Sequence, residues 1–408
     1  MSQQSGQAGI SREAEFLLGC VSAYATGAKA GRVAELAVCD LDWELLVRMA
    51  SWHAVTPILY RELSGCPELV PAAILADLRR RFRANAMRNA YLASELVQIT
   101  SLLKDKGVPV IAFKGPVLAL AAYGDLGVRQ FIDLDILVRP SDLGMTRDLL
   151  LSQGYRSRFS GLGEKERGFF LWCEEAFEKK DWLVCIDVHW QMNPQYFPYA
   201  PEGEMLWRRT VSVELQGVAV NTLSTSDLLL HLCVHGAKHG WTTLGWICDV
   251  AMLAHRTLGL EWSRMIAEAT SLGGRRLLLL GLYLAYDLLG AAIPDELISM
   301  ARDDGVTVNI AAQVKRRIFG NIGERASVFQ EWMVPMRAIE STRARVRYLA
   351  GRGLSPTVDD WEFARLPRPF FPLYYLLHPV RLAVAQGPRL IRAFIGLPAH
   401  VSPASEGV

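Results

Sequence analysis

Hydrophobic residues recur at helical spacing towards both ends of the chain, whereas a central segment has the pattern of strands. Helical spacing follows Ser11, Asp42 and Pro71 and continues to about residue 106. It returns after Ser224, over residues 228–240, 244–256, 262–271, 275–290 and 306–319. The pattern predicts two helical regions with a smaller unit of another kind between them.

The central segment combines short apolar runs with turn signals. Runs rich in β-branched and aromatic residues predict three buried strands, at 108–113, 131–138 and 182–190. Pro116 suits the first turn of a short helix, and Gln216-Gly217 predicts a hairpin within 211–220. We therefore expect an α+β fold, in which a small mixed sheet is embedded between helical regions. Its expected divisions are 1–106, 107–223, 224–365 and 366–408.

The C-terminal tail begins with a proline-aromatic break at 366–372. Residues 373–395 are apolar with three spaced arginines, which predicts an amphipathic helix that Pro379 and Gly387-Pro388 kink or split. Packing on the core is one interpretation. The alternative is contact with a membrane surface or with a biosynthetic complex.

Composition narrows the class of protein. A formal net charge of +2 over 408 residues supplies no global field for nucleic acid, so we expect no extended nucleic-acid partner. The polar N-terminus lacks the pattern of a signal peptide, and the apolar run 277–292 is too short to span a membrane. The seven cysteines are scattered without a C-x-x-C pair, which is typical of reduced thiols. We expect a cytoplasmic protein, with peripheral contact to the inner membrane as the alternative.

Two aspartates supply the first candidate chemistry. Asp133 and Asp135 are two residues apart in a predicted strand, so their carboxylates share one face. Two adjacent anions among apolar residues are costly unless a cation neutralises them. Oxygen ligands of this kind suit Mg²⁺ or Mn²⁺. Alone, however, the pair also fits two exposed aspartates at the end of a strand.

Residues before the pair extend the candidate site. Lys114 and Gly115 directly follow the first strand, where glycine permits close approach of a ligand and the following helix presents its amide-rich end to a phosphate. Arg129 would clamp an anionic oxygen. The alternatives are a surface lysine at Lys114 and a structural ion pair at Arg129.

A third carboxylate tests the hypothesis. Asp187 lies among strand-forming residues, as Asp133 and Asp135 do, and His189 shares its face. If the two strands are neighbours, three carboxylates converge, and such a group can hold metal ions that align a hydroxyl with a leaving pyrophosphate. Asp187 would also accept the proton of the hydroxyl. His189 would contact substrate or orient a ligand, or simply be a hydrogen-bonded strand residue.

Three histidines lie at i, i+4 and i+8 in the helix 228–240: His231, His235 and His239. This spacing places them close to one helical face. We expect His235, Lys238 and His239 to line a cleft and contact nucleotide phosphates or the acceptor. Packing in the helical core is the alternative, and a zinc site is less favoured because the repeat contains no carboxylate. Asp249 would pair with a histidine or with another charge.

These motifs together resemble the DNA polymerase beta superfamily of nucleotidyltransferases. More narrowly, the chain is similar to a bacterial family called uncharacterised nucleotidyltransferases, which accompanies lasso-peptide and exopolysaccharide gene clusters. The likeness spans roughly residues 40–380 in order and spacing. It is carried by residues 113–115, Tyr123, Arg129, 132–138, 186–190, 231–239 and 244–250.

The resemblance implies an enzyme that moves a nucleotidyl group from a nucleoside triphosphate to a small-molecule or peptide acceptor. Asp133, Asp135 and Asp187 would be its catalytic metal ligands. The superfamily usually has Gly-Gly or Gly-Ser after the first strand, whereas this chain has Lys114-Gly115-Pro116, and proline supplies no amide donor. A nucleotide- or partner-binding module without catalysis is therefore the alternative.

Overall fold

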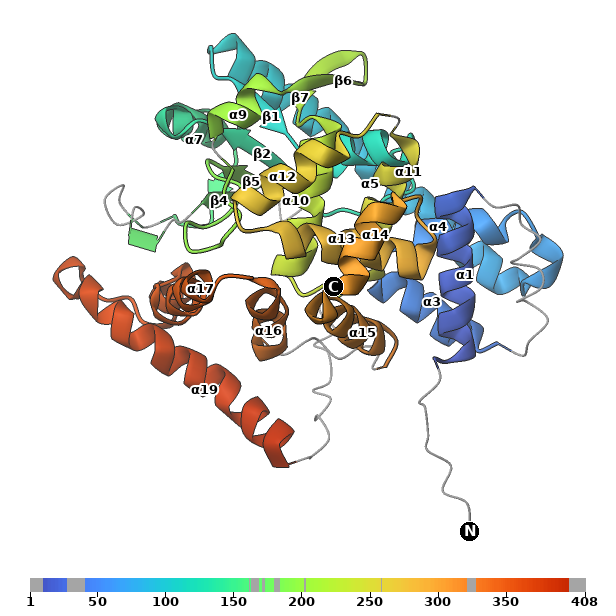
Figure 1. Cartoon of the computed structure of the whole chain (residues 1–408). Coiled ribbons are helices and arrows are strands. Elements are labelled where there is room, and N and C mark those ends of the chain that lie inside the picture. The colour runs from blue at the N-terminus through green and yellow to red at the C-terminus, as the bar shows by residue number, and fades with distance from the viewer. Residues whose placement is uncertain are drawn as a thin grey trace.

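The described strands form a five-stranded mixed sheet and a separate hairpin, and the remaining elements are helical (Figure 1). The computed structural model describes residues 10–27, 41–160, 162, 169–170, 173–179, 184–201, 203–257, 259–320 and 328–395. The architecture is α+β, as the sequence predicts.

The sheet has the order β1-β2-β5-β4-β3. Its strands are β1 (Val110–Ala112), β2 (Asp133–Val138), β3 (Arg156–Ser157), β4 (Glu174–Lys179) and β5 (Val184–His189). Strands β2 and β5 run parallel, and the other neighbours are antiparallel. The three predicted strands are confirmed as β1, β2 and β5, with residues 182–183 lying outside the described ranges. The predicted hairpin is also confirmed, as β6 (Val211–Leu215) and β7 (Val218–Thr222).

Strands β3 and β4 were not predicted. Four of the six residues of β4 are charged, so its sequence lacks the apolar run expected of a strand. Only Glu175 and Phe177 are buried in it, in an alternating pattern. The strand forms because β5 pairs along its whole length.

The helices expected after Ser11, Asp42 and Pro71 begin where the sequence predicts, whereas those at 56–63 and 203–208 were not predicted. The Ser11 Oγ accepts a hydrogen bond from the Ala14 amide at 3.2 Å, and Asp42 Oδ1 accepts one from the Leu45 amide at 2.8 Å. The elements are α1 (Arg12–Thr26), α3 (Trp43–Trp52), α4 (Thr56–Leu63), η1 (Pro67–Leu69), α5 (Ala72–Asp105), α6 (Gly115–Leu118), η2 (Ala119–Tyr123), η3 (Pro140–Asp142), α7 (Leu143–Ser152) and α9 (Gly203–Arg208).

The second helical region follows the hairpin. It comprises α10 (Thr225–Lys238), α11 (Leu244–Arg256), α12 (Trp262–Ser271), α13 (Arg275–Leu289), α14 (Asp295–Asp303), α15 (Gly305–Gly320), α16 (Val328–Ala338), α17 (Thr342–Leu354), α18 (Val358–Phe363), η4 (Arg368–Leu373) and α19 (Tyr374–Ile395). The prediction that prolines would split the last helix is wrong, because α19 continues through Pro379 and Pro388. Each proline removes one helical hydrogen bond, and the turns on either side retain theirs. Within the described ranges, no helix is both long enough and apolar enough to cross a membrane.

The core of the second helical region is built around Trp241. Its indole is fully buried and packs against Gly236 of α10 and Gly281 of α13, where any side chain would overlap it. The two helices therefore approach each other closely around one large ring. This packing fixes α10, the helix that carries the three histidines.

We predict that Gly281→Ala destabilises the protein. An added Cβ would lie 2.6 Å from Cys233 Sγ and 3.0 Å from the Trp241 ring. Overpacking of this kind costs about 1–3 kcal/mol in the free energy of unfolding, measurable by chemical denaturation. The control is Gly144→Ala in α7, where an added Cβ meets nothing within 4 Å. Equal stability of the two variants would contradict the prediction.

Candidate active site

A cavity of about 880 Å³ lies between the sheet and the helical region. Nine of the ten residues predicted for the site line it: Lys114, Arg129, Asp133, Asp135, Asp187, His189, His235, Lys238 and His239. Only Gly115 is not among the lining residues. The cavity is large enough for a nucleotide, since small-molecule sites typically measure about 300–1,000 Å³.

The register of the sheet brings the carboxylates together. Asp135 of β2 lies directly opposite Asp187 of β5, and the two strands are parallel neighbours. Residues opposite each other share a face of the sheet, and Asp133 lies on that same face two residues away. On the other side of β5, Glu174 of β4 lies opposite His189. One face of three strands thus presents four carboxylates and an imidazole to the cavity.

Lys114 balances the charge of the most deeply buried carboxylate. Its Nζ lies 2.9 Å from Asp135 Oδ1, and His189 Nε2 lies 3.2 Å from the same oxygen. Burial acts to raise the pKa of Asp135, but Lys114 and His189 together hold it well below its ordinary value. Burial likewise opposes the charge of Lys114, whose pKa is nevertheless raised by Asp135 and Asp133. The ion pair therefore stays charged.

The other two aspartates lack such a partner. Burial and the neighbouring Asp135 raise the pKa of Asp133, and the same two causes raise the pKa of Asp187 to about 7. When the pKa of a buried carboxyl group is raised in this way, any cation that approaches it stabilises its charged form. In addition, Asp135 Oδ2 is buried without a hydrogen-bond partner. These groups are the ones that a bound cation would satisfy.

The donor set fits a hard divalent cation, because it consists of carboxylate oxygens and includes the unpartnered Oδ2. In the described part of the chain, however, no three His, Cys, Asp or Glu side chains are grouped to hold a metal ion as they stand. The Lys114 ammonium occupies the place of a cation beside Asp135. A metal ion would therefore need these side chains to rearrange around it.

Gly115 approaches strand β2 closely. Its φ of +53° is unfavourable for other residues, and an added Cβ would lie 3.1 Å from the Asp133 carbonyl oxygen. The close approach that glycine permits is therefore to strand β2. This turn places the Lys114 side chain over the sheet face.

Arg129 forms a structural ion pair, which was the alternative to binding an anionic ligand. Its Nε and Nη2 donate to the Asp249 carboxylate at 2.9 and 3.0 Å, and Tyr123 Oη donates to Asp249 Oδ1 at 2.7 Å. Asp249 thus pairs with Arg129 rather than with a histidine. Arg129 still borders the cavity, and its Nη1 is buried without a partner. The pair joins the loop before β2 to helix α11.

The histidines of α10 lie in a column, as their spacing predicts. Ring centroids are 5.8 Å apart for His231 and His235 and 4.6 Å apart for His235 and His239. Burial and the nearby Lys114 lower the pKa of His231 and of His235 well below the ordinary value, and burial and Lys238 lower that of His239 to about 3. The imidazoles are therefore neutral. Positive charge on this side of the cavity comes from Lys238.

Several lining residues were missed because their elements were not predicted. Glu174 comes from β4, and its Oε2 lies 3.2 Å from His189 Nδ1. Burial acts to raise the pKa of Glu174, but His189 and Lys238 lower it. Four of the six residues of this strand are charged, so its sequence offered no clear strand signal. Arg352 and residues 357–359, from the C-terminal helices, also line the cavity.

The sequence also predicts a loop over 157–168, with a mobile flap over the cleft as one interpretation, and most of this loop lies outside the described residues. In its described part, Phe159 and Leu162 belong to one apolar cluster with Phe170. Phe371 and Tyr374, from the C-terminal region, complete this cluster. This apolar cluster closes one side of the cavity, because Phe159 and Phe170 also line it.

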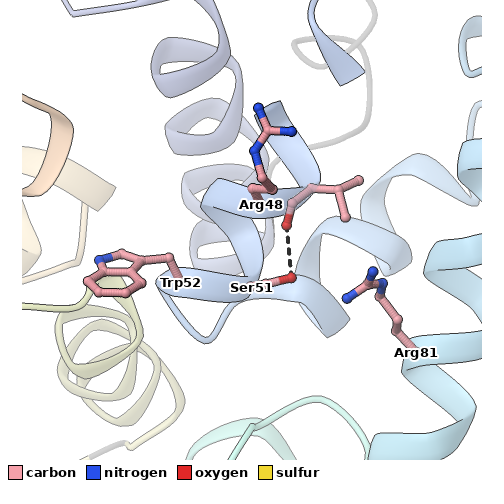
Figure 2. Close-up of a pocket in the computed structure, with 5 residues that line it drawn as sticks. Arg48, Ser51, Trp52 and Arg81 are labelled. Atoms are coloured by element: carbon pink, nitrogen blue, oxygen red, sulfur yellow. Dashed lines mark hydrogen bonds between the residues drawn. The ribbon is translucent and has the colours of Figure 1, made fainter. Parts of the chain in front are cut away.

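A second pocket, of about 400 Å³, lies at helix α3 (Figure 2). It is lined by Val47, Arg48, Ser51, Trp52 and Arg81. Arg81 pairs with Asp77, and the Ser51 hydroxyl donates to the Val47 carbonyl at 2.9 Å. With its cations paired and no carboxylate or imidazole in its lining, this pocket offers none of the chemistry of the larger cavity.

Comparison with known proteins points to a family. The model of the family described as "Uncharacterised nucleotidyltransferase" matches residues 40–290, which is more than half of the chain. No curated protein matches the chain significantly. The matched range contains every carboxylate of the site described above, whereas Arg352 and residues 357–359 lie beyond it.

We predict that Asp187→Asn stabilises the metal-free protein more at pH 8 than at pH 5. The unfolded chain loses the Asp187 proton near pH 4, whereas the folded protein keeps it up to about pH 7 because its pKa is raised. The free energy of unfolding of the wild type therefore falls as pH rises from about 4 to about 7. Asparagine does not titrate, so the variant does not show this fall. The difference in free energy of unfolding should grow by about 2 kcal/mol between pH 5 and pH 8. Denaturation in the presence of a chelator measures it, and an equal difference at both pH values would contradict the assignment.

Proposed function

The chain belongs to the family of uncharacterised nucleotidyltransferases, and from that membership we propose that it moves a nucleotidyl group from a nucleoside triphosphate to a hydroxyl or phosphate acceptor. The observation that carries the proposal is the set of three aspartates on one sheet face at the wall of a nucleotide-sized cavity. Asp133, Asp135 and Asp187 would hold Mg²⁺ or Mn²⁺. A bound ion would neutralise the phosphates and polarise the phosphoryl group.

Asp187 is suited to act as the general base. In the metal-free protein, burial and the neighbouring Asp135 raise its pKa, so it binds a proton more readily than an ordinary carboxylate. It borders the cavity beside Asp135, which stays ionised. We propose that Asp187 takes the proton of the acceptor hydroxyl as the phosphorus–oxygen bond forms, and that pyrophosphate leaves from the opposite side.

Lys114 is suited to bind a phosphate. If the aspartates held a cation, the Lys114 ammonium would be available to bind a phosphate of the nucleotide. Lys238 carries a second positive charge into the cavity.

The acceptor is proposed from the family resemblance. A lasso peptide or a precursor of a polysaccharide would meet the requirement for a free hydroxyl or phosphate, and the reaction would take place in the cytoplasm. A net charge of +2 gives no reason to expect an extended nucleic acid as the acceptor.

A catalytically inactive binding module is the second candidate. Two observations favour it: Lys114 is already paired with Asp135, and Pro116 removes an amide from the turn where phosphates usually bind. In that case the nucleotide would bind without release of pyrophosphate.

We predict that wild-type protein binds a nucleoside triphosphate in a Mg²⁺-dependent manner and that an Asp133→Asn, Asp135→Asn double variant binds it at least about tenfold more weakly, since carboxylate ligands dominate affinity for hard cations. Isothermal titration calorimetry with and without Mg²⁺ measures the effect. The matched control is Asp105→Asn, an exposed carboxylate at the end of α5.

Pyrophosphate release over a panel of peptide, sugar-phosphate and hydroxyl acceptors separates the two candidates. Release by the wild type and its loss in Asp187→Asn would support catalysis. Binding without release would support the inactive module. Equal Mg²⁺-dependent binding by the wild type and the double variant would exclude the metal site.

A further inference from the structure

The three histidines of α10 and Trp246 of α11 form one continuous side of the cavity, here called the histidine–tryptophan wall. Trp246 lies 5.5 Å from both His235 and His239, measured between ring centroids. All four side chains line the cavity. Because a helix rises about 1.5 Å per residue, the wall extends roughly 12 Å from His231 to His239.

The inner end of the wall adjoins the carboxylate site. The Phe113 ring lies 5.2 Å from His231 and 5.1 Å from His189, and His189 contacts Asp135. The outer end, with His239 and Trp246, lies farther along the cavity.

The wall has hydrogen-bonding groups that nothing in the described structure satisfies. His231 is only 5% exposed, and both of its ring nitrogens lack a partner. A neutral imidazole offers one donor and one acceptor, and leaving either unsatisfied in a buried position is unfavourable. Because the rings are neutral, a phosphate is a poor match for them. An uncharged planar ring with donors and acceptors on its edge fits better.

We propose that the histidine–tryptophan wall binds the heteroaromatic base of the nucleotide. This inference rests on the proposed function, because it assumes that the triphosphate lies towards Lys114 and the three aspartates. Trp246 and the histidine rings provide apolar faces on which a base stacks. The unpartnered His231 nitrogens, together with those of His235, would meet the edge of the base.

The test compares a nucleoside triphosphate, its nucleoside and inorganic tripolyphosphate, each titrated calorimetrically into the full chain with Mg²⁺. The wild type should bind at least one triphosphate about tenfold or more tightly than tripolyphosphate, because the base adds a stacked contact. Trp246→Leu should abolish that preference and leave tripolyphosphate binding unchanged, whereas Trp246→Phe should restore it. Trp52→Leu, at the second pocket, is the matched control.

The outcomes separate the two proposals. Equal affinity of the wild type for triphosphate and tripolyphosphate, or an unchanged preference in Trp246→Leu, would overturn the base site while leaving the metal site intact. Binding of nucleosides without tripolyphosphate would support the base site and remove the proposed phosphate site. Absence of binding by all three ligands would overturn both.

A second inference concerns helix α19, which lies along the edge of the molecule next to α17 (Figure 1). One side of it is anchored: His378 Nδ1 lies 2.7 Å from Asp360 Oδ2, and Tyr374 Oη donates to the Ala364 carbonyl at 2.6 Å. The other side is apolar and exposed. Leu376, Val380 and Val384, spaced four residues apart, are 68%, 57% and 63% exposed.

The charge of this segment favours one kind of partner. Residues 363–405 contain five arginines and no aspartate or glutamate, and one of the five, Arg381, is paired with Asp360 on the anchored side. An amphipathic helix with arginines and an exposed apolar stripe is suited to an anionic lipid surface, where it lies in the interface without crossing it. We infer that α19 docks the protein on an anionic membrane.

Vesicle flotation of the full chain tests this inference. The protein should float with phosphatidylcholine vesicles that contain phosphatidylglycerol, less with phosphatidylcholine alone, and less at high salt. A Leu376→Ser, Val380→Ser double variant should reduce flotation about tenfold, because it removes apolar area from the interface. The control changes two exposed apolar residues of α17, Val346→Ser and Leu349→Ser.

Absence of flotation by the wild type would overturn the inference. So would a concentration-dependent dimer, seen by analytical ultracentrifugation, that the Leu376→Ser, Val380→Ser variant abolishes. In that case a second copy of the chain covers the stripe.

Discussion

The pairing of Lys114 with Asp135 is the interaction on which the site depends. Strands β2 and β5 place three aspartates on one buried face, and an unpaired buried carboxylate would cost several kcal/mol. Because Lys114 projects from the turn after β1, the chain supplies a counterion from within its own sheet. The carboxylates can therefore be assembled before any ligand arrives.

A second buried ion pair holds the two halves of the cavity together. Arg129 and Tyr123, from the segment before β2, converge on Asp249 of α11. Helix α11 also carries Trp246, and α10 beside it is fixed by the Trp241 ring between Gly236 and Gly281. The sheet carboxylates and the histidine–tryptophan wall are thus connected through contacts that lie behind the cavity.

The sequence predicted the fold class, the positions of several helices and nine of the lining residues, because strand alternation and helix spacing reveal which side chains share a face. Asp133, Asp135 and Asp187 follow directly from that reasoning. The same reasoning does not show which side chains contact one another across the fold. Nothing in the local sequence shows that Lys114 faces Asp135, that Arg129 faces Asp249, or that Gly115 packs against β2. Strand β4 was missed because its neighbour β5, not its own composition, determines its structure.

Part of the cavity is lined by residues of the C-terminal helices, and this affects the chemistry that the cavity can support. Arg352 and residues 357–359 complete the lining, yet they lie some sixty residues or more beyond the range that the family model matches. Without residues 291–408 the cavity would keep the four carboxylates of the sheet and lose the side formed by Arg352 and residues 357–359, which includes Asp359. Under the proposed function, losing that side would open the cavity to water, which would compete with the acceptor and favour hydrolysis over transfer. The C-terminal helices would then influence the outcome of the reaction, although the proposed metal ligands lie in the matched range.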